Sequence, residues 1–161
     1  MNYVLFTFLG VVLLLITIID AREQRIPDVL SLPLIPIGLL FAEGKWPASF
    51  AEAYLISPDR LASMLIVGAA LVAVAKIYER LRNVPGLGMG DVKLAMAAAA
   101  WIAPSFVPFW LFISAVSALL YALIMGIDAQ TRIAFGSFMA PWFFVIYVLT
   151  CVADHSILIV L

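Results

Sequence analysis

The sequence predicts an all-α, polytopic membrane protein with about six transmembrane helices, folded as one domain over residues 1–161. Of its residues, 66% are hydrophobic and only 12% are charged, and the mean hydropathy is +1.17. A water-soluble domain carries about twice that share of charged residues. The hydrophobic residues are also gathered into segments separated by polar connections, which is typical of helices that cross a bilayer. The net charge of −1 indicates no basic surface, so we expect no nucleic-acid partner.

The helices are expected in six apolar segments. The first is close to the length of about 20 residues that a transmembrane helix needs. The second contains Pro33 and Pro36 and is expected to be irregular, because a proline removes a backbone donor and kinks a helix. Ser57, Pro58 and Asp59 predict the start of the third, since they supply a cap, a first-turn proline and a first-turn acid. The segments are residues 2–19, 29–41, 61–78, 92–103, 105–127 and 135–152.

The fourth segment is short for a transmembrane helix. Its twelve residues cover roughly 18 Å, against a hydrocarbon core of about 30 Å. We therefore expect either a helix that ends partway or a glycine-containing approach that enters the membrane beside protein or water. Either arrangement places Asp91, directly before this segment, near a wet recess.

The basic residues predict the orientation. With six spans, Lys45 and Arg60 fall on one side and seven basic residues fall on the other. Because basic residues are enriched in cytoplasmic loops, the richer side is expected to face the cytoplasm and both termini to lie outside. Asp20 and Asp91 then share the cytoplasmic side. The seven are Arg22, Arg25, Lys76, Arg80, Arg82, Lys93 and Arg132.

Two aspartates are the candidate catalytic groups. Asp20 ends the first apolar segment, and Asp91 follows Gly88 and Gly90 and precedes Lys93. Ionisable residues inside membrane segments are usually functional. Two neighbouring carboxyl groups share a proton, so one can activate water while the other polarises a peptide carbonyl. Glycines at 88 and 90 are expected to keep the backbone open for an extended substrate.

Each of these residues also has a structural interpretation. Asp20 can be a boundary charge at the end of a span, and Asp91 can cap the fourth helix. Asp28 is an alternative partner for either aspartate. Lys93 either pairs with a carboxylate or marks the cytoplasmic boundary.

Metal and cofactor chemistry is not indicated. The chain has one histidine, His155, and one cysteine, Cys151. A tetrathiolate zinc site, an internal disulfide and a histidine-based triad are therefore not expected. We expect no metal and no cofactor.

Three motifs together resemble the type IV prepilin peptidase family of intramembrane aspartyl proteases. Residues 20–27 (DAREQRIP) resemble the family's first motif, an aspartate at the end of a span followed by basic residues and Ile-Pro. Residues 88–93 (GMGDVK) resemble its glycine-x-glycine-aspartate signature, and residues 132–141 (RIAFGSFMAP) its late Phe-Gly-x-Phe element. The motifs occur in the family's order, and the resemblance covers essentially the whole chain.

The resemblance implies a catalytic role for Asp20 and Asp91. It also implies cleavage of the basic leader of a prepilin or pseudopilin precursor on the cytoplasmic side of the bacterial inner membrane, among lipid. The residues implied to shape the site or contact the substrate are Arg25, Pro27, Gly88, Gly90, Lys93, Phe135 and Gly136.

The chain departs from the family's pattern at two positions. Asp28 stands where asparagine is common, and Ser137 where proline is frequent. The paired cysteines of the bifunctional members' zinc-binding segment are also missing from these residues. We therefore expect a single-activity form without N-methylation, of the kind that serves tight-adherence (Flp-type) pili.

Two other functional classes are compatible with the sequence. A small proton-coupled transporter or channel subunit would use the two carboxylates as a relay. A non-catalytic assembly subunit would instead use a stripe of small residues for close helix contacts. That stripe consists of Ser114, Ala118, Ala122 and Gly126.

Overall fold

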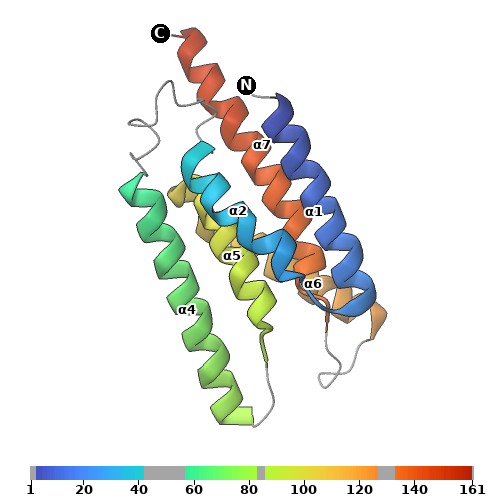
Figure 1. The fold of residues 1–161 in the computed structure, drawn as a ribbon. Coiled ribbons are helices and arrows are strands. Elements are labelled where there is room, and N and C mark those ends of the chain that lie inside the picture. The colour runs from blue at the N-terminus through green and yellow to red at the C-terminus, as the bar shows by residue number, and fades with distance from the viewer. Residues whose placement is uncertain (1–2, 42–56, 83–85, 127–132, 161) are drawn as a thin grey trace.

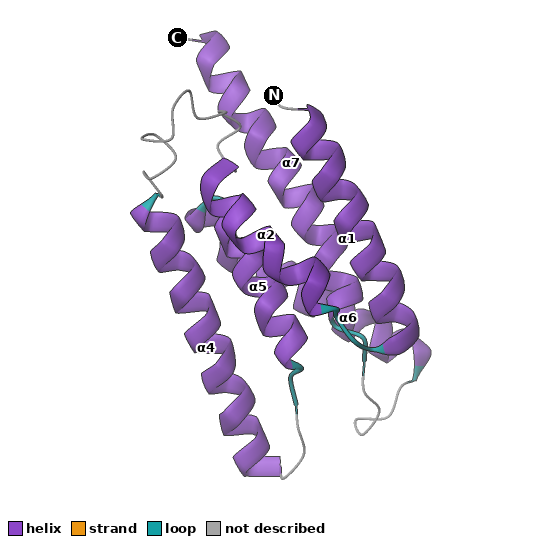
Figure 2. Ribbon diagram, in the orientation of Figure 1, coloured by secondary structure: helices purple, strands orange, loops and turns teal. Residues whose placement is uncertain are grey.

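The computed structural model describes residues 3–41, 57–82, 86–126 and 133–160, the last nine of these by their backbone alone. In these ranges the chain forms six α-helices and one 3-10 turn (Figures 1 and 2). Each predicted segment corresponds to one α-helix, which confirms the all-α fold class. The elements are α1 (Tyr3–Glu23), α2 (Asp28–Phe41), α4 (Pro58–Arg82), α5 (Met89–Trp101), η1 (Pro104–Phe106), α6 (Val107–Met125) and α7 (Gly136–Val160).

Three stretches are long and apolar enough to cross a membrane, namely α1, α4 and η1 together with α6. The helix α2 and the apolar part of α7, Gly136–Cys151, are shorter. A polytopic membrane protein is therefore supported, whereas six complete spans are not shown. Contrary to the expected irregularity, α2 continues through Pro33 and Pro36.

The ends of α1 set the position of Asp20. The helix runs to Glu23, so Asp20 lies in its last turn and not after it. Gln24 has a φ of 51° and donates its N–H to the Asp20 carbonyl at 2.8 Å. This left-handed residue with its single backbone bond ends the helix and turns the chain toward α2.

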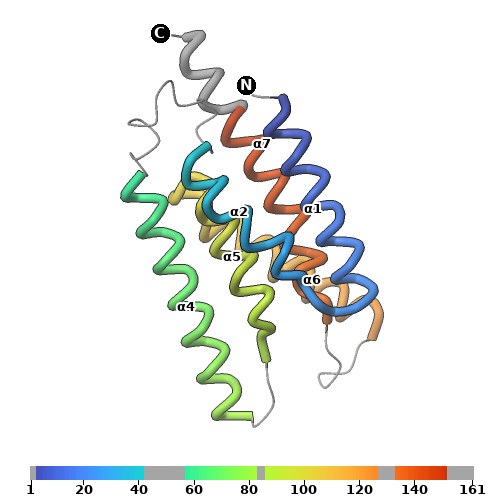
Figure 3. Tube along the Cα trace, in the orientation of Figure 1, coloured from blue at the N-terminus to red at the C-terminus, as the bar shows by residue number. Residues whose placement is uncertain are grey.

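The helix α5 lies in the middle of the bundle. It packs against α4, α2 and α7, while α1 and α6 pack along α7 (Figure 1). Alanines on α5 are fully buried, and such small side chains let neighbouring helices approach closely. In the tube of Figure 3, α2 and α5 run side by side.

The far end of α5 is held by hydrogen bonds to two neighbouring helices. Arg60, at the start of α4, donates through Nη1 to the Ala100 carbonyl at 3.2 Å and the Trp101 carbonyl at 2.6 Å. The last carbonyls of a helix lack internal partners, so this cation stabilises the end of α5. Trp101 donates through Nε1 to the Leu34 carbonyl of α2 at 2.7 Å. These bonds explain how a helix of 13 residues is fixed inside the bundle.

The predicted orientation stays a prediction. Lys45 and Arg132, on which it partly rests, lie outside the described residues, as does the side chain of His155. The end of α1, the end of α4 and the start of α5 lie at the same end of the bundle, opposite the two chain termini (Figure 1). The two aspartates are therefore found at one end of the molecule.

Candidate active site

The carboxylate of Asp20 is buried against the start of α7. Its side chain comes from the last turn of α1, and the residue is 4% exposed. Its Oδ2 accepts the backbone N–H of Ser137 at 2.7 Å, and the backbone of Gly136 also hydrogen bonds to this carboxylate. A buried carboxylate needs such donors, since burial without hydrogen bonds is costly. The packing of α1 along α7 brings these donors to it.

Asp91 is the third residue of α5, and its carboxylate faces the backbone of Gly136, as the carboxylate of Asp20 does. Its carboxylate hydrogen bonds to the backbone of Gly88, the residue before the helix, and to the backbone of Gly136. An acid in this position that reaches back to the residue before the helix forms half of a capping box. The structural interpretation of Asp91 as a first-turn cap is therefore compatible with a place in the site.

The two carboxylates form one site. Asp20 and Asp91 both bind the backbone of Gly136 and interact electrostatically with each other. They come from different helices and are separated by a long stretch of sequence, so the fold brings them together. This is the arrangement that two carboxyl groups require in order to share a proton.

Ile26 lies between the start of α5 and the start of α7, and sequence reasoning missed it. A Cβ on Gly90 would lie 3.0 Å from Ile26 Cβ. A Cβ on Gly136 would lie 2.5 Å from Ile26 Cδ1 and 2.9 Å from Asp20 Oδ2. Gly90 and Gly136 therefore let this chain's own loop approach closely. Nothing in the spacing of the sequence marks Ile26 apart from its place in the Ile-Pro pair.

Gly88, the residue before α5, lies next to the Asp91 carboxylate. A Cβ there would lie 3.1 Å from Asp91 Oδ2, a contact tighter than most real ones. The residue itself is exposed. A side chain at position 88 would therefore crowd the Asp91 carboxylate.

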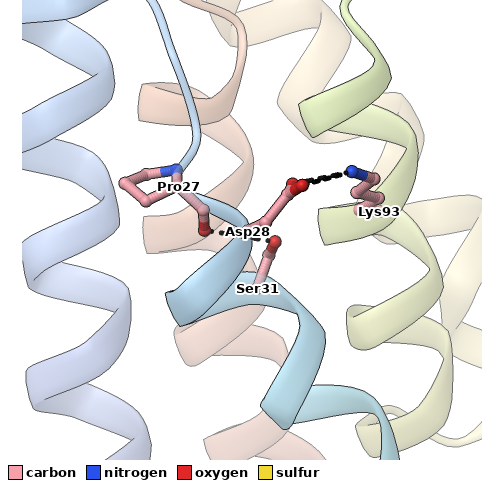
Figure 4. A network of polar contacts seen from close by, with 4 residues as sticks. All are labelled: Pro27, Asp28, Ser31 and Lys93. Atoms are coloured by element: carbon pink, nitrogen blue, oxygen red, sulfur yellow. Dashed lines mark hydrogen bonds and ion pairs between the residues drawn. The ribbon is translucent and has the colours of Figure 1, made fainter.

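An ion pair joins α2 to α5 beside the site. Lys93 Nζ lies 2.7 Å from Asp28 Oδ1 and 2.8 Å from Asp28 Oδ2 (Figure 4). Of the two interpretations of Lys93, the structure shows the pairing with a carboxylate. That carboxylate is Asp28. Asp28 had been an alternative partner for either aspartate, whereas the structure pairs it with Lys93.

The other predicted site residues surround this centre. Arg25 is exposed on the loop between α1 and α2. The Pro27 carbonyl accepts the N–H groups of Leu30 and Ser31 and so starts α2. The Phe135 carbonyl accepts those of Phe138 and Met139 and starts α7.

Ser137 is a second residue that the sequence did not single out for its contacts. Its amide binds Asp20, and its hydroxyl donates to the Ala134 carbonyl at 2.6 Å.

Within the described residues, His, Cys, Asp and Glu side chains form no group of three or more that could hold a metal ion.

Comparison with known proteins identifies the relatives of the chain. Residues 7–123 match the type IV leader peptidase family. This range contains both aspartates and ends before α7. No solved structure matches the chain.

The names of the curated relatives describe leader peptidases, two of them also N-methyltransferases. The prepilin leader peptidase/N-methyltransferase of Neisseria gonorrhoeae is 32% identical over 124 residues, covering 77% of this chain and 41% of the relative. The protein of the same name from Dichelobacter nodosus is 29% identical over 128 residues, with 80% and 42% covered. The leader peptidase HopD of Escherichia coli is 33% identical over 137 residues, with 79% and 81% covered. The chain thus spans about two fifths of the two longer relatives and about four fifths of HopD.

Proposed function

The chain belongs to the type IV leader peptidase family, and on that premise we propose that it is an aspartic endopeptidase that removes the leader of prepilin or pseudopilin precursors. The observation that carries this proposal is that Asp20 and Asp91, from different helices, both lie at the start of α7, where the Ser137 amide binds Asp20 at 2.7 Å and the backbone of Gly136 faces both carboxylates. Hydrolysis of a peptide by two carboxyl groups needs them within reach of one water and one carbonyl.

The proposed reaction uses the proton that the pair shares. The ionised carboxyl group accepts a proton from water, whose oxygen attacks the carbonyl carbon of the scissile peptide. The protonated one donates a hydrogen bond to the carbonyl oxygen as negative charge develops on it. The intermediate then collapses, the C–N bond breaks, and the leaving nitrogen takes the proton that came from water. The backbone amides of Gly88, Gly136 and Ser137 hold the two carboxylates in place.

We place the site on the cytoplasmic face of the bacterial inner membrane. The support is the cluster of basic residues at the ends of the helices that carry or border the site. Arg22 and Arg25 follow Asp20 closely, and Arg80 and Arg82 end α4 at the same end of the bundle (Figure 1). Positive residues of this kind are retained on the cytoplasmic side.

The finer part of the proposal concerns the substrate and the number of activities. We propose a leader peptidase without N-methylation that serves Flp-type pili. It is supported by the match to HopD, whose name gives the peptidase function alone.

The test is cleavage of a prepilin precursor by the purified protein in lipid, with the product analysed by mass spectrometry. We expect the wild type to cut and Asp20→Asn and Asp91→Asn each to be inactive, because either change removes a member of the pair. Asp59→Asn, the same change at an exposed position at the start of α4, should remain active. Cleavage by either dyad variant at the wild-type rate would refute the proposed mechanism. With S-adenosylmethionine added as methyl donor, the mass of the product also reports any methylation of its new N-terminus.

A further inference from the structure

We propose that Asp28 and Lys93 form a positioning pair, which holds the loop between α1 and α2 against α5 and so keeps Ile26 in place between the starts of α5 and α7. Neither residue of the pair needs to touch the substrate in this role. The inference rests on the proposed function, because its kinetic consequence is an effect on cleavage. Its structural consequence can be measured without any cleavage.

The geometry places the pair next to the site but not in it. Both oxygens of Asp28 face the lysine nitrogen across the gap between α2 and α5 (Figure 4). Lys93 lies two positions after Asp91 on the same helix, and residues two apart do not share a helix face. The lysine therefore binds a carboxylate on one side of α5, while Asp91 faces Gly136 on another.

The pair is connected to the site through a short stretch of chain. Asp28 opens α2 and is two residues beyond Ile26. Ile26 in turn is in close contact with the positions of Gly90 on α5 and Gly136 on α7. Holding Asp28 on α5 at Lys93 therefore fixes where the preceding residues cross the start of α5. Release of the pair would let this loop move away from Gly90.

A contribution to folding stability does not explain the ion pair between Asp28 and Lys93. The side chains of Lys93 and Asp28 are 31% and 55% exposed, and exposed ion pairs contribute little to folding. The helices α2 and α5 are already joined by the buried bond from Trp101, at the far end of α5, to the carbonyl of Leu34 in the middle of α2. What the ion pair adds is a fixed distance at the end that carries the site.

Charge reversal tests the proposal. We would prepare Asp28→Lys, Lys93→Asp and the double variant, together with the milder Asp28→Asn in case a reversal impairs folding. Each reversal places like charges opposite each other, so the loop should separate from α5. The double variant restores opposite charges at the same two positions. Asp59→Lys, at the corresponding place in α4, measures the cost of a lysine in the first turn of a helix away from the site.

The first readout is hydrogen exchange at the amides of Leu30 and Ser31, which bond to the Pro27 carbonyl. We expect faster exchange in both single reversals and wild-type exchange in the double. This result does not depend on peptidase activity. If the wild type fails to cleave any precursor, the proposed function fails while the exchange data still decide the role of the pair.

The second readout is the separation of kcat from KM for prepilin cleavage. We expect kcat to fall about 10-fold in the single reversals with little change in KM, and the double to recover to within about threefold of wild type. Asp28→Asn should lie between. Unchanged exchange in the single variants, or a double no better than the singles, would overturn the proposal. A rise in KM alone would assign the lysine to substrate binding and would equally overturn it.

Discussion

Gly136→Ala tests whether the site requires the absence of a side chain at the start of α7. The added methyl group would lie 2.5 Å from Ile26 Cδ1 and 2.9 Å from Asp20 Oδ2. The end of the isoleucine side chain can rotate away. The carboxylate oxygen is held by the Ser137 amide at 2.7 Å and must lose part of that bond in order to move.

The size of the effect follows from these distances. To reach an ordinary contact distance, the oxygen must move by about 0.5 Å, because such contacts begin near 3.4 Å. A misplacement of about 1 Å can cost about 100-fold in rate, so we expect kcat to fall between about 10-fold and 100-fold. The crowding of Ile26 should lower the free energy of unfolding by about 1–3 kcal/mol.

A second substitution separates the two clashes. Ile26→Val removes Cδ1 and so relieves the 2.5 Å contact, whereas the contact with Cγ1 at 3.0 Å and the contact with Asp20 stay. In the double variant with Gly136→Ala, we expect the thermal midpoint in detergent to recover in part and the cleavage rate to stay low. Ile26→Val alone serves as the control. Full activity in the double variant, or in Gly136→Ala alone, would show that displacement of Asp20 is not limiting and would refute the reasoning.

Two further substitutions address single hydrogen bonds. Ser137→Ala keeps the amide that binds Asp20 and removes only the hydroxyl bond to the Ala134 carbonyl, so activity should stay within about threefold while stability falls by about 1 kcal/mol. Loss of cleavage in a folded Ser137→Ala protein would instead assign the hydroxyl a part in the reaction. Trp101→Phe removes the buried bond to the Leu34 carbonyl and should lower the free energy of unfolding by about 1–3 kcal/mol, with kcat nearly unchanged because this bond lies at the other end of α5. An unchanged melting curve for Trp101→Phe would contradict that estimate.

The sequence was sufficient for the helices because hydropathy alone determines where apolar segments lie. Ser57 and Pro58 also marked the start of α4 correctly, since capping chemistry is local. The placement of Asp20 and Asp91 on one side could be anticipated from topology, because the two predicted spans between them are an even number of crossings. None of these inferences required knowledge of side-chain packing.

The contacts that shape the site depend on packing and could not be obtained in this way. The pairing of Asp28 with Lys93 joins residues 65 positions apart, and several other charged residues would have served equally well by sequence. The space at Gly90 was expected to be open for substrate, whereas Ile26 lies against it. The prolines of α2 were predicted to make this segment irregular. The helix continues through them, because tertiary packing maintains a helix that proline disfavours in isolation.

The use of backbone amides to hold the two carboxylates has a chemical consequence. The donors come from Gly88, Gly136 and Ser137, at the starts of α5 and α7. A lysine or arginine in their place would stabilise both carboxylates as anions and remove the proton that the acid needs. Amides at a helix start orient a carboxylate and partly offset its burial without adding a full positive charge. Lys93, two positions after Asp91, is held by Asp28 on another side of α5. In the proposed mechanism, keeping that charge on Asp28 leaves the proton of the pair available for catalysis.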